Sequence, residues 1–138
     1  MLTRTSLQDL ARMRLDDALL LAAHCRWSSA YYLSGYAVEL GLKACAARIF
    51  QPDSIPDKRL VNAIYTHNLD ELVSVAGLRP ELRRSLSDDV VFASYWGVAS
   101  QWNENSRYEE WDSVNANILL NAIANDESGV FRWVKKHW

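Results

Sequence analysis

The chain has 138 residues, of which 49% are hydrophobic and 23% are charged, and this composition predicts one globular domain over residues 1–138. Its net charge of −2 argues against a protein that coats nucleic acid through a broad basic surface, but is compatible with a local basic groove. No apolar run approaches the ~20 residues that span a bilayer, and the N-terminal residues do not resemble a signal peptide. We therefore expect a cytoplasmic protein with no membrane contact.

The first half of the chain predicts two long helices. Leucines and alanines at helical spacing give one apolar side to a first helix from about Ser6 to His24. After a break at 25–27, the stretch Trp27–Phe50 is apolar on almost every side, and Ser28 or Ser29 is expected to cap it. Such a helix is normally the buried centre of a domain, so we expect it to contact both the first and the last helix.

The second half predicts shorter helices. Residues 51–59 carry two of the three prolines and predict a loop, after which the capping-box pattern Asn68–Glu71 opens a short helix that ends at Gly77. Pro80 favours the first turn of a helix that runs to about Trp102, with a break near Ser87 as an alternative.

The polar residues 103–111 then predict a connection, and Asp112 or Ser113 is expected to cap a final long helix that continues through Val134. No segment shows clean alternation with a period of two residues. The pattern therefore predicts an all-α fold, an up-and-down bundle of about five helices with antiparallel neighbours.

The middle of the Trp27–Phe50 helix carries two kinds of unexpected residue. Gly35 and Gly41 predict places where another helix backbone approaches closely, which a side chain would prevent. Glu39 and Lys43 lie one turn apart in the order that suits a helical ion pair. Burying charges costs several kcal/mol unless they are paired and hydrogen-bonded, so this pair needs an explanation.

Two interpretations of the Glu39–Lys43 pair are open. Tyr32 and Tyr36 share a face with it, because the four residues follow one another at spacings of four, three and four. In the functional interpretation the helix floors a polar groove, in which the tyrosines stack or form hydrogen bonds. In the structural interpretation a buried ion pair fixes the register of the helix, and the tyrosines pack as core.

Further polar candidates lie outside this helix. His67 precedes a predicted helix start, where an imidazole either joins the cap or keeps its neutral form near the positive helix end. Asn103, Arg107 and Tyr108 belong to a polar cluster between two long helices. That cluster is either a binding site or a solvated loop in which Arg107 pairs with a nearby acid.

Metal and cofactor chemistry is not indicated. The two cysteines have no CxxC spacing, and no group of histidine, cysteine and aspartate has the spacing of metal ligands. The chain also lacks a glycine-rich phosphate loop, a G-x-S-x-G motif and a paired-carboxylate signature, so no pattern points to an enzyme.

Several segments together resemble one family. The run Ser29–Ala44, SAYYLSGYAVELGLKA, resembles the signature helix of HEPN domains, the nucleotide-binding domains of higher eukaryotes and prokaryotes. The segment Thr66–Leu72, THNLDEL, is similar to a T-H-x-L-x-x-L element that follows this helix in many members. Arg107-Tyr108 and the ending Trp133–Trp138 also fit, so that the resemblance extends from about Ala11 to Trp138.

The resemblance implies a helical up-and-down bundle that commonly dimerises. Many HEPN proteins are small partners of minimal nucleotidyltransferases, often encoded beside them as toxin–antitoxin pairs. Others are metal-independent ribonucleases, whose composite active site forms across the dimer. Those nucleases use an arginine and a histidine separated by four to six residues at the start of the last helix.

This chain departs from the nuclease pattern. Arg107 stands in the expected place, but Asp112, Ser113 and Val114 occupy the positions where the histidine would fall. An ionised aspartate can serve as a base but not readily as an acid. We therefore expect a non-catalytic, homodimeric HEPN protein that binds a nucleotide, an RNA end or a nucleotidyltransferase partner. The alternatives are a ribonuclease toxin with a non-standard site, which His67 completes from elsewhere in the fold, and a purely structural dimerisation domain.

Two predictions concern how these residues assemble. We expect Glu39, Lys43, His67 and Arg107 to converge, so that Glu39 pairs with one cation and leaves the other to receive a phosphate. Further binding candidates beside them are Tyr36, Asn103 and Tyr108. We also expect a two-fold dimer, because six Trp and six Tyr exceed what one small core readily hides. The candidates for its interface are Trp96, Trp102, Trp111 and Trp133.

Overall fold

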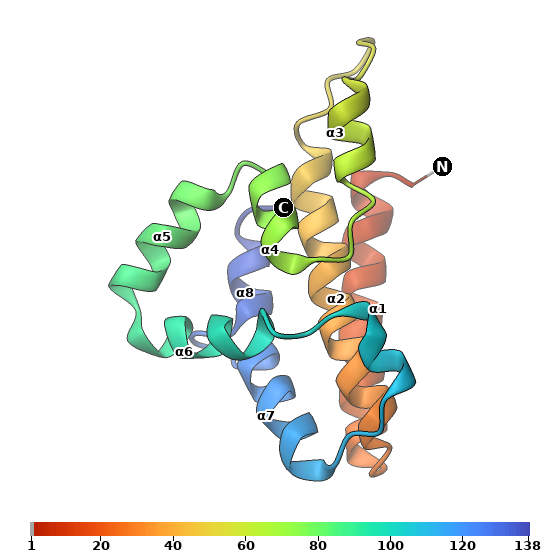
Figure 1. Cartoon of the computed structure of the whole chain (residues 1–138), viewed down its shortest axis with the longest axis vertical. Coiled ribbons are helices and arrows are strands. Elements are labelled where there is room, and N and C mark those ends of the chain that lie inside the picture. Colours follow the sequence, from red (N-terminus) through yellow and green to blue (C-terminus); the bar gives the residue numbers. More distant parts are fainter. Residues whose placement is uncertain (1) are drawn as a thin grey trace.

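The computed structural model describes residues 2–138, and over this range the chain forms eight α-helices, one 3-10 helix and no strand (Figure 1). In chain order these are α1 (Arg4–Ala23), α2 (Trp27–Ala47), α3 (Lys58–Ala63), α4 (Leu69–Val75), α5 (Arg79–Asp88), α6 (Val90–Ala99), the 3-10 helix η1 (Glu104–Tyr108), α7 (Ser113–Ala124) and α8 (Val130–Lys135). The predicted all-α bundle is confirmed, with more helices than the pattern indicates. Within residues 2–138, no helix has both the length and the apolar content needed to cross a bilayer.

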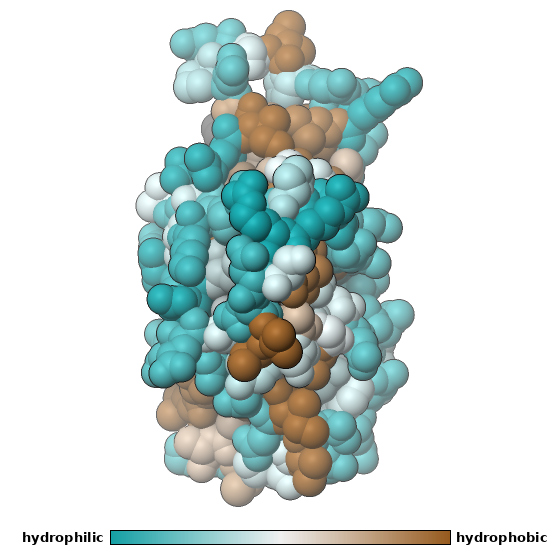
Figure 2. Space-filling model, turned by 90° about the vertical axis from the view of Figure 1, so that its left-hand side faces the viewer, coloured by the Kyte–Doolittle hydropathy of each residue, from teal (hydrophilic) through white to brown (hydrophobic). Residues whose placement is uncertain are grey.

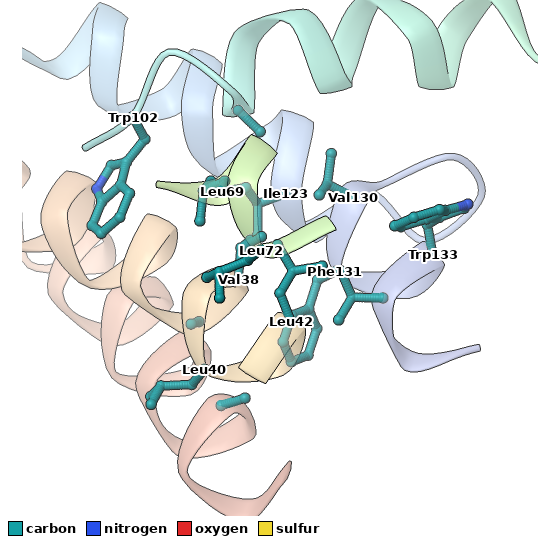
Figure 3. Packing of buried hydrophobic residues seen from close by; sticks show 14 of the residues in the cluster. Val38, Leu40, Leu42, Leu69, Leu72, Trp102, Ile123, Val130, Phe131 and Trp133 are labelled. Carbon is teal, nitrogen blue, oxygen red and sulfur yellow. The ribbon is translucent and has the colours of Figure 1, made fainter. Parts of the chain in front are cut away.

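Helix α2 is the centre of the bundle, as predicted. It packs along α1 and also contacts α4, α7, α8 and η1, so it meets the first helix and both C-terminal helices (Figure 1). Val38 and Leu42 of α2 are fully buried, and Figure 3 shows them among apolar side chains from α4, α7 and α8. These contacts fix the position of α2, and with it the direction in which its polar residues point.

The two glycines of α2 lie at close approaches, but their neighbours are side chains rather than the helix backbone that we expected. The Trp102 indole lies against Gly35, where an added Cβ would overlap it. A Cβ on Gly41 would come within 2.8 Å of Val134 Cγ1. Glycine at position 35 therefore makes room for Trp102 on the surface of α2.

The start of α2 differs from the prediction of a serine cap. The helix begins at Trp27, and the preceding residue, Arg26, makes no side-chain cap. The Ser28 Oγ instead accepts a hydrogen bond from the backbone N–H of Trp111 at 2.8 Å. The hydroxyl of Ser28 thus ties the segment after η1 to the first turn of α2.

Helix α4 begins and ends close to the predicted residues. The Asn68 side chain accepts a hydrogen bond from the N–H of Glu71 at 3.0 Å, and Gly77 follows the helix with a φ of +71°, in the left-handed region. The reciprocal half of the predicted capping box does not form, because the Glu71 carboxylate accepts a hydrogen bond from the Thr66 hydroxyl instead. The loop predicted over 51–59 ends earlier than expected, since α3 starts at Lys58.

Two of the predicted helices are each divided into two, which partly explains why the structure has more helices than the five expected. The helix predicted from Pro80 onwards is broken at Asp89, two residues from the alternative break near Ser87, and Asp89 caps α6 by accepting a hydrogen bond from the N–H of Phe92. The single long final helix was wrongly predicted, because Asn125 ends α7 and its side chain accepts hydrogen bonds from the N–H groups of Glu127 and Ser128. Short polar side chains that bond the nearby backbone compete with helix continuation at both places.

The tryptophans pack inside the chain rather than on a dimer surface. Trp96, Trp102 and Trp133 are buried, and Trp111 is half-buried and stacks on Tyr31 with ring centroids 3.7 Å apart. The prediction that Trp96, Trp102 and Trp133 form an interface is therefore wrong, because one chain is enough to hide them.

On the side where α5 lies, hydrophilic residues cover most of the surface, and apolar residues form separate patches (Figure 2).

Candidate functional site

One face of α2 carries polar and aromatic side chains over about three turns. Tyr32, Tyr36, Glu39 and Lys43 lie on it, and we call these four residues the polar face of α2. Two neighbouring elements reach α2: α4, which His67 precedes, and η1, which contains Arg107 (Figure 1). The polar face is therefore built by α2 and completed from two separate parts of the chain.

Glu39 is the buried centre of this face. Its side chain is 2% exposed, and its Oε1 accepts a hydrogen bond from Lys43 Nζ at 3.0 Å. The same oxygen is 2.8 Å from His67 Nδ1. Since Lys43 holds a positive charge beside the carboxylate, and an ionised carboxylate can only accept hydrogen bonds, His67 Nδ1 is the donor.

This hydrogen bond fixes the roles of the two imidazole nitrogens. Nδ1 carries the proton that it donates to Glu39, so in the neutral ring Nε2 has the free lone pair. The His67 side chain is 48% exposed, whereas that of Glu39 is buried. The imidazole therefore presents its accepting nitrogen away from the buried carboxylate.

The second carboxylate oxygen of Glu39, Oε2, lacks a hydrogen-bond donor among the described residues. This oxygen is also buried. Leaving a buried polar atom without a partner costs about 1–3 kcal/mol, and more for a charged group. A residue that served only to hold the register of the helix would be expected to have both oxygens satisfied.

The tyrosines connect Glu39 to the other end of the polar face. Tyr32 and Tyr36 are half-buried and stack with ring centroids 5.9 Å apart and an interplanar angle of 6°. Tyr32 also stacks on Trp102, the residue that lies against Gly35. Burial raises the pKa of the Tyr36 phenol, and the negative charge of Glu39 raises it further, so Tyr36 keeps its proton.

Arg107 lies at the Tyr32 end of the polar face. Its guanidinium is 4.9 Å from the centroid of the exposed Tyr108 ring, and the neighbouring phenol groups of Tyr108 and Tyr32 raise the pKa of Arg107. Beside it lies a cavity of about 250 Å³. The cavity is lined by Ser28, Ser29, Tyr32, Leu33, Arg107 and Glu109. Arg107 is the one cation among these lining residues, and it keeps its positive charge.

The structure brings three of the four expected residues together. Glu39, Lys43 and His67 form one hydrogen-bonded cluster, and Glu39 pairs with Lys43 rather than with Arg107. Arg107 contacts Tyr32, which precedes Glu39 by seven residues, a rise of about 10 Å along the helix. The expected single cluster is thus drawn out into a row along α2.

The remaining candidates have different roles. Tyr36 and Tyr108 belong to the row, but Asn103 caps η1 by accepting a hydrogen bond from the N–H of Asn105 at 2.9 Å. Sequence reasoning missed the contribution of Trp102, which supports Tyr32. Gly35 was the available signal, because it indicated that some group approaches α2 at that turn.

A larger cavity, about 440 Å³, lies between α1, α7 and α8. Arg12, Arg132 and Lys135 line it, but Asp16 and Asp126 line it as well. All five of these side chains lie at exposed positions, in contrast to the buried Glu39. We therefore place the candidate site on the polar face of α2, where charge is buried at a cost.

Comparison with known proteins adds no assignment. No protein-family model, no curated protein and no solved structure gives a significant match to the chain. Among residues 2–138, no group of three or more histidine, cysteine, aspartate or glutamate side chains is placed to hold a metal ion. A proposal about function therefore rests on the geometry of the polar face and on the family resemblance of its residues.

Proposed function

We propose that this chain is a non-catalytic binding module of the HEPN type, which holds a nucleotide or single-stranded RNA on the polar face of α2. One observation carries the proposal: two stacked tyrosines lie between two cationic side chains. Arg107 is at the Tyr32 end of the row, and Lys43 lies one turn beyond Glu39 at the other end. A row of aromatic rings flanked by cations matches the needs of a single strand, whose bases stack and whose phosphates are anionic.

Each member has a distinct part in this proposal. The Arg107 guanidinium receives a phosphate, for which its planar set of donors is well suited. Tyr32 and Tyr36 offer ring surfaces to bases. Lys43 is bound to Glu39 and is 16% exposed, so it adds positive charge to the opposite end without moving freely.

The same geometry favours binding over the alternative, a ribonuclease. In the nucleases that the chain resembles, the histidine stands a few residues after the arginine. Here His67 donates to Glu39, whereas Arg107 contacts Tyr32 and Tyr108. An acid–base group has to be within hydrogen-bond reach of the atoms it serves. Glu39 and Tyr32, the α2 residues beside which His67 and Arg107 lie, are about two helical turns apart, which favours binding over this nuclease chemistry.

The homodimer and the minimal nucleotidyltransferase partner are further parts of the proposal, and the resemblance alone supports them. Neither depends on Trp96, Trp102 or Trp133, which the core of one chain already buries. Light scattering at micromolar concentration tests the dimer directly. A monomer there would remove that part of the proposal and leave the polar face of α2 unaffected.

A binding experiment tests the central part. We expect fluorescence anisotropy to show that wild type binds a labelled single-stranded RNA, and that Arg107→Ala raises the Kd about tenfold. Arg83→Ala is the matched control, because Arg83 is an exposed arginine of α5. Equal Kd values for wild type and Arg107→Ala, with unchanged melting, would contradict the proposal.

A further inference from the structure

We infer that His67 makes this site selective for ribose over deoxyribose, by accepting a hydrogen bond from the 2′-hydroxyl. The inference rests on the proposed function, because it assigns a role within the same binding face. Its starting point is the short contact of 2.8 Å between His67 Nδ1 and Glu39 Oε1. In the neutral imidazole, the buried carboxylate fixes the proton on Nδ1, and so leaves Nε2 as a directed acceptor.

The direction of the acceptor follows from the shape of the ring. Nδ1 and Nε2 lie on different edges of the imidazole, so when Nδ1 points at the buried Glu39, Nε2 points away from it. The His67 side chain is 48% exposed and that of Glu39 is 2% exposed, so Nε2 lies on the solvent side of the pair. Nε2 makes no hydrogen bond with residues 2–138, because the hydrogen bond of the His67 ring is made by Nδ1.

The surroundings indicate which hydroxyl this nitrogen would meet. Lys43 donates to the same Glu39 oxygen as His67, so an ammonium group lies next to the imidazole. A sugar hydroxyl that reaches Nε2 therefore has a cation beside it, where the adjoining phosphate is favoured. Tyr36 lies on the same face of α2, about one turn before Glu39, and its ring is placed to meet the neighbouring base.

The selectivity follows from hydrogen-bond accounting. A ribose 2′-hydroxyl donates to Nε2, whereas deoxyribose has no group at that position and leaves Nε2 without a partner. The 2′-hydroxyl is the group that distinguishes RNA from DNA for a protein. Losing one such hydrogen bond is expected to weaken binding about tenfold. The capping interpretation of His67 predicts no such difference, because a capping residue does not contact the ligand.

The experiment compares probes that differ only at the 2′ position. We expect anisotropy with wild type to give a Kd for oligouridine RNA about tenfold lower than for oligodeoxyuridine of the same length. A 2′-fluoro oligouridine is expected to bind like the DNA, because it has no proton to donate. In His67→Ala, we expect the ratio of the Kd for DNA to the Kd for RNA to fall from about ten to about one, while the Kd for DNA stays unchanged.

Two further variants separate this role from a structural one. Glu39→Gln can donate to Nδ1 and so allow the other tautomer, and we expect it to reduce the ratio. Lys43→Met is expected to weaken RNA and DNA equally and to keep the ratio. Equal binding of RNA, DNA and the fluoro probe by wild type would overturn the inference but not the proposed function. If wild type binds none of the three, the proposed function fails and the inference fails with it.

Discussion

The two faces of α2 both contain fully buried side chains, but those side chains differ in whether their partners are complete. On the apolar face, small residues such as Ala37 and Ala44 are fully buried and let neighbouring helices approach closely. On the polar face, Glu39 is equally buried, yet one of its oxygens has no hydrogen-bond partner among residues 2–138. Apolar groups need only contact, whereas polar groups need directed partners. The apolar face is therefore complete within the chain, whereas the polar face holds a buried acceptor that the described residues leave unpaired.

The largest effect is expected on the apolar side. Leu42 is fully buried, so Leu42→Ala removes contacts and leaves a cavity, and we expect it to lower the free energy of unfolding by about 2–5 kcal/mol. Ile118→Ala is the matched control, because Ile118 is 50% exposed and its truncation should change stability by less than about 0.5 kcal/mol. Urea denaturation of both variants measures the difference. Similar losses in the two proteins would contradict the central position of α2.

The close approach at Gly35 gives the next effect. A Cβ at this position overlaps the Trp102 indole, so Gly35→Ala should destabilise the protein by about 1–3 kcal/mol. Gly97 provides the control, since a Cβ there meets no atom within 4 Å. Gly97→Ala is expected to stabilise α6 by about 0.5–1 kcal/mol. Thermal melting measures both variants, and an unchanged or higher Tm for Gly35→Ala would show that the packing of Trp102 does not require glycine at position 35.

On the polar face, we expect stability to depend on whether charged side chains keep their partners rather than on side-chain volume. Lys43→Met leaves Glu39 without its ammonium partner, and we expect a loss of about 1–2 kcal/mol, because His67 still donates to Oε1. The double variant Glu39→Leu/Lys43→Met removes both charges and should be at least as stable as the single variant. A double-mutant cycle measures this. If the double variant is the less stable one, the pair contributes to stability in its own right, and the structural interpretation gains support.

The sequence predicts the apolar face of α2 more completely than the polar face. The apolar spacing of Trp27–Phe50 was enough to predict a central buried helix, because contact with any apolar neighbour satisfies it. The same reasoning placed Glu39 and Lys43 on one face, since that needs only helical geometry. It did not place His67 on Glu39 or Arg107 on Tyr32, because those contacts join segments that are far apart in the chain.

The helix breaks at Asp89 and Asn125 have a local cause. Asp89 and Asn125 interrupt helices that the apolar spacing runs through, because their side chains accept hydrogen bonds from nearby backbone N–H groups. Ser28 shows the opposite case, a plausible cap whose hydroxyl accepts from Trp111 instead. Short polar residues have several partners of similar energy, and the tertiary fold decides among them.

The smallest effect concerns the two cysteines and leaves stability unchanged. Burial raises the pKa of the Cys45 thiol to about 12, so at neutral pH it stays protonated and unreactive inside α2. Cys25 is exposed just after α1. We expect a thiol reagent to modify Cys25 in the folded protein and Cys45 only after unfolding, as peptide mass spectrometry can show. Rapid modification of Cys45 in the native protein would contradict the tight packing of this helix.

The most direct test of the binding face is photochemical crosslinking of a single-stranded RNA that carries 4-thiouridine, followed by identification of the modified residues. The account predicts crosslinks to Tyr32, Tyr36 or His67, all on the polar face of α2 or beside it. Crosslinks confined to the cavity between α1, α7 and α8, lined by Arg12 and Arg132, would contradict it and move the binding site to the opposite set of helices.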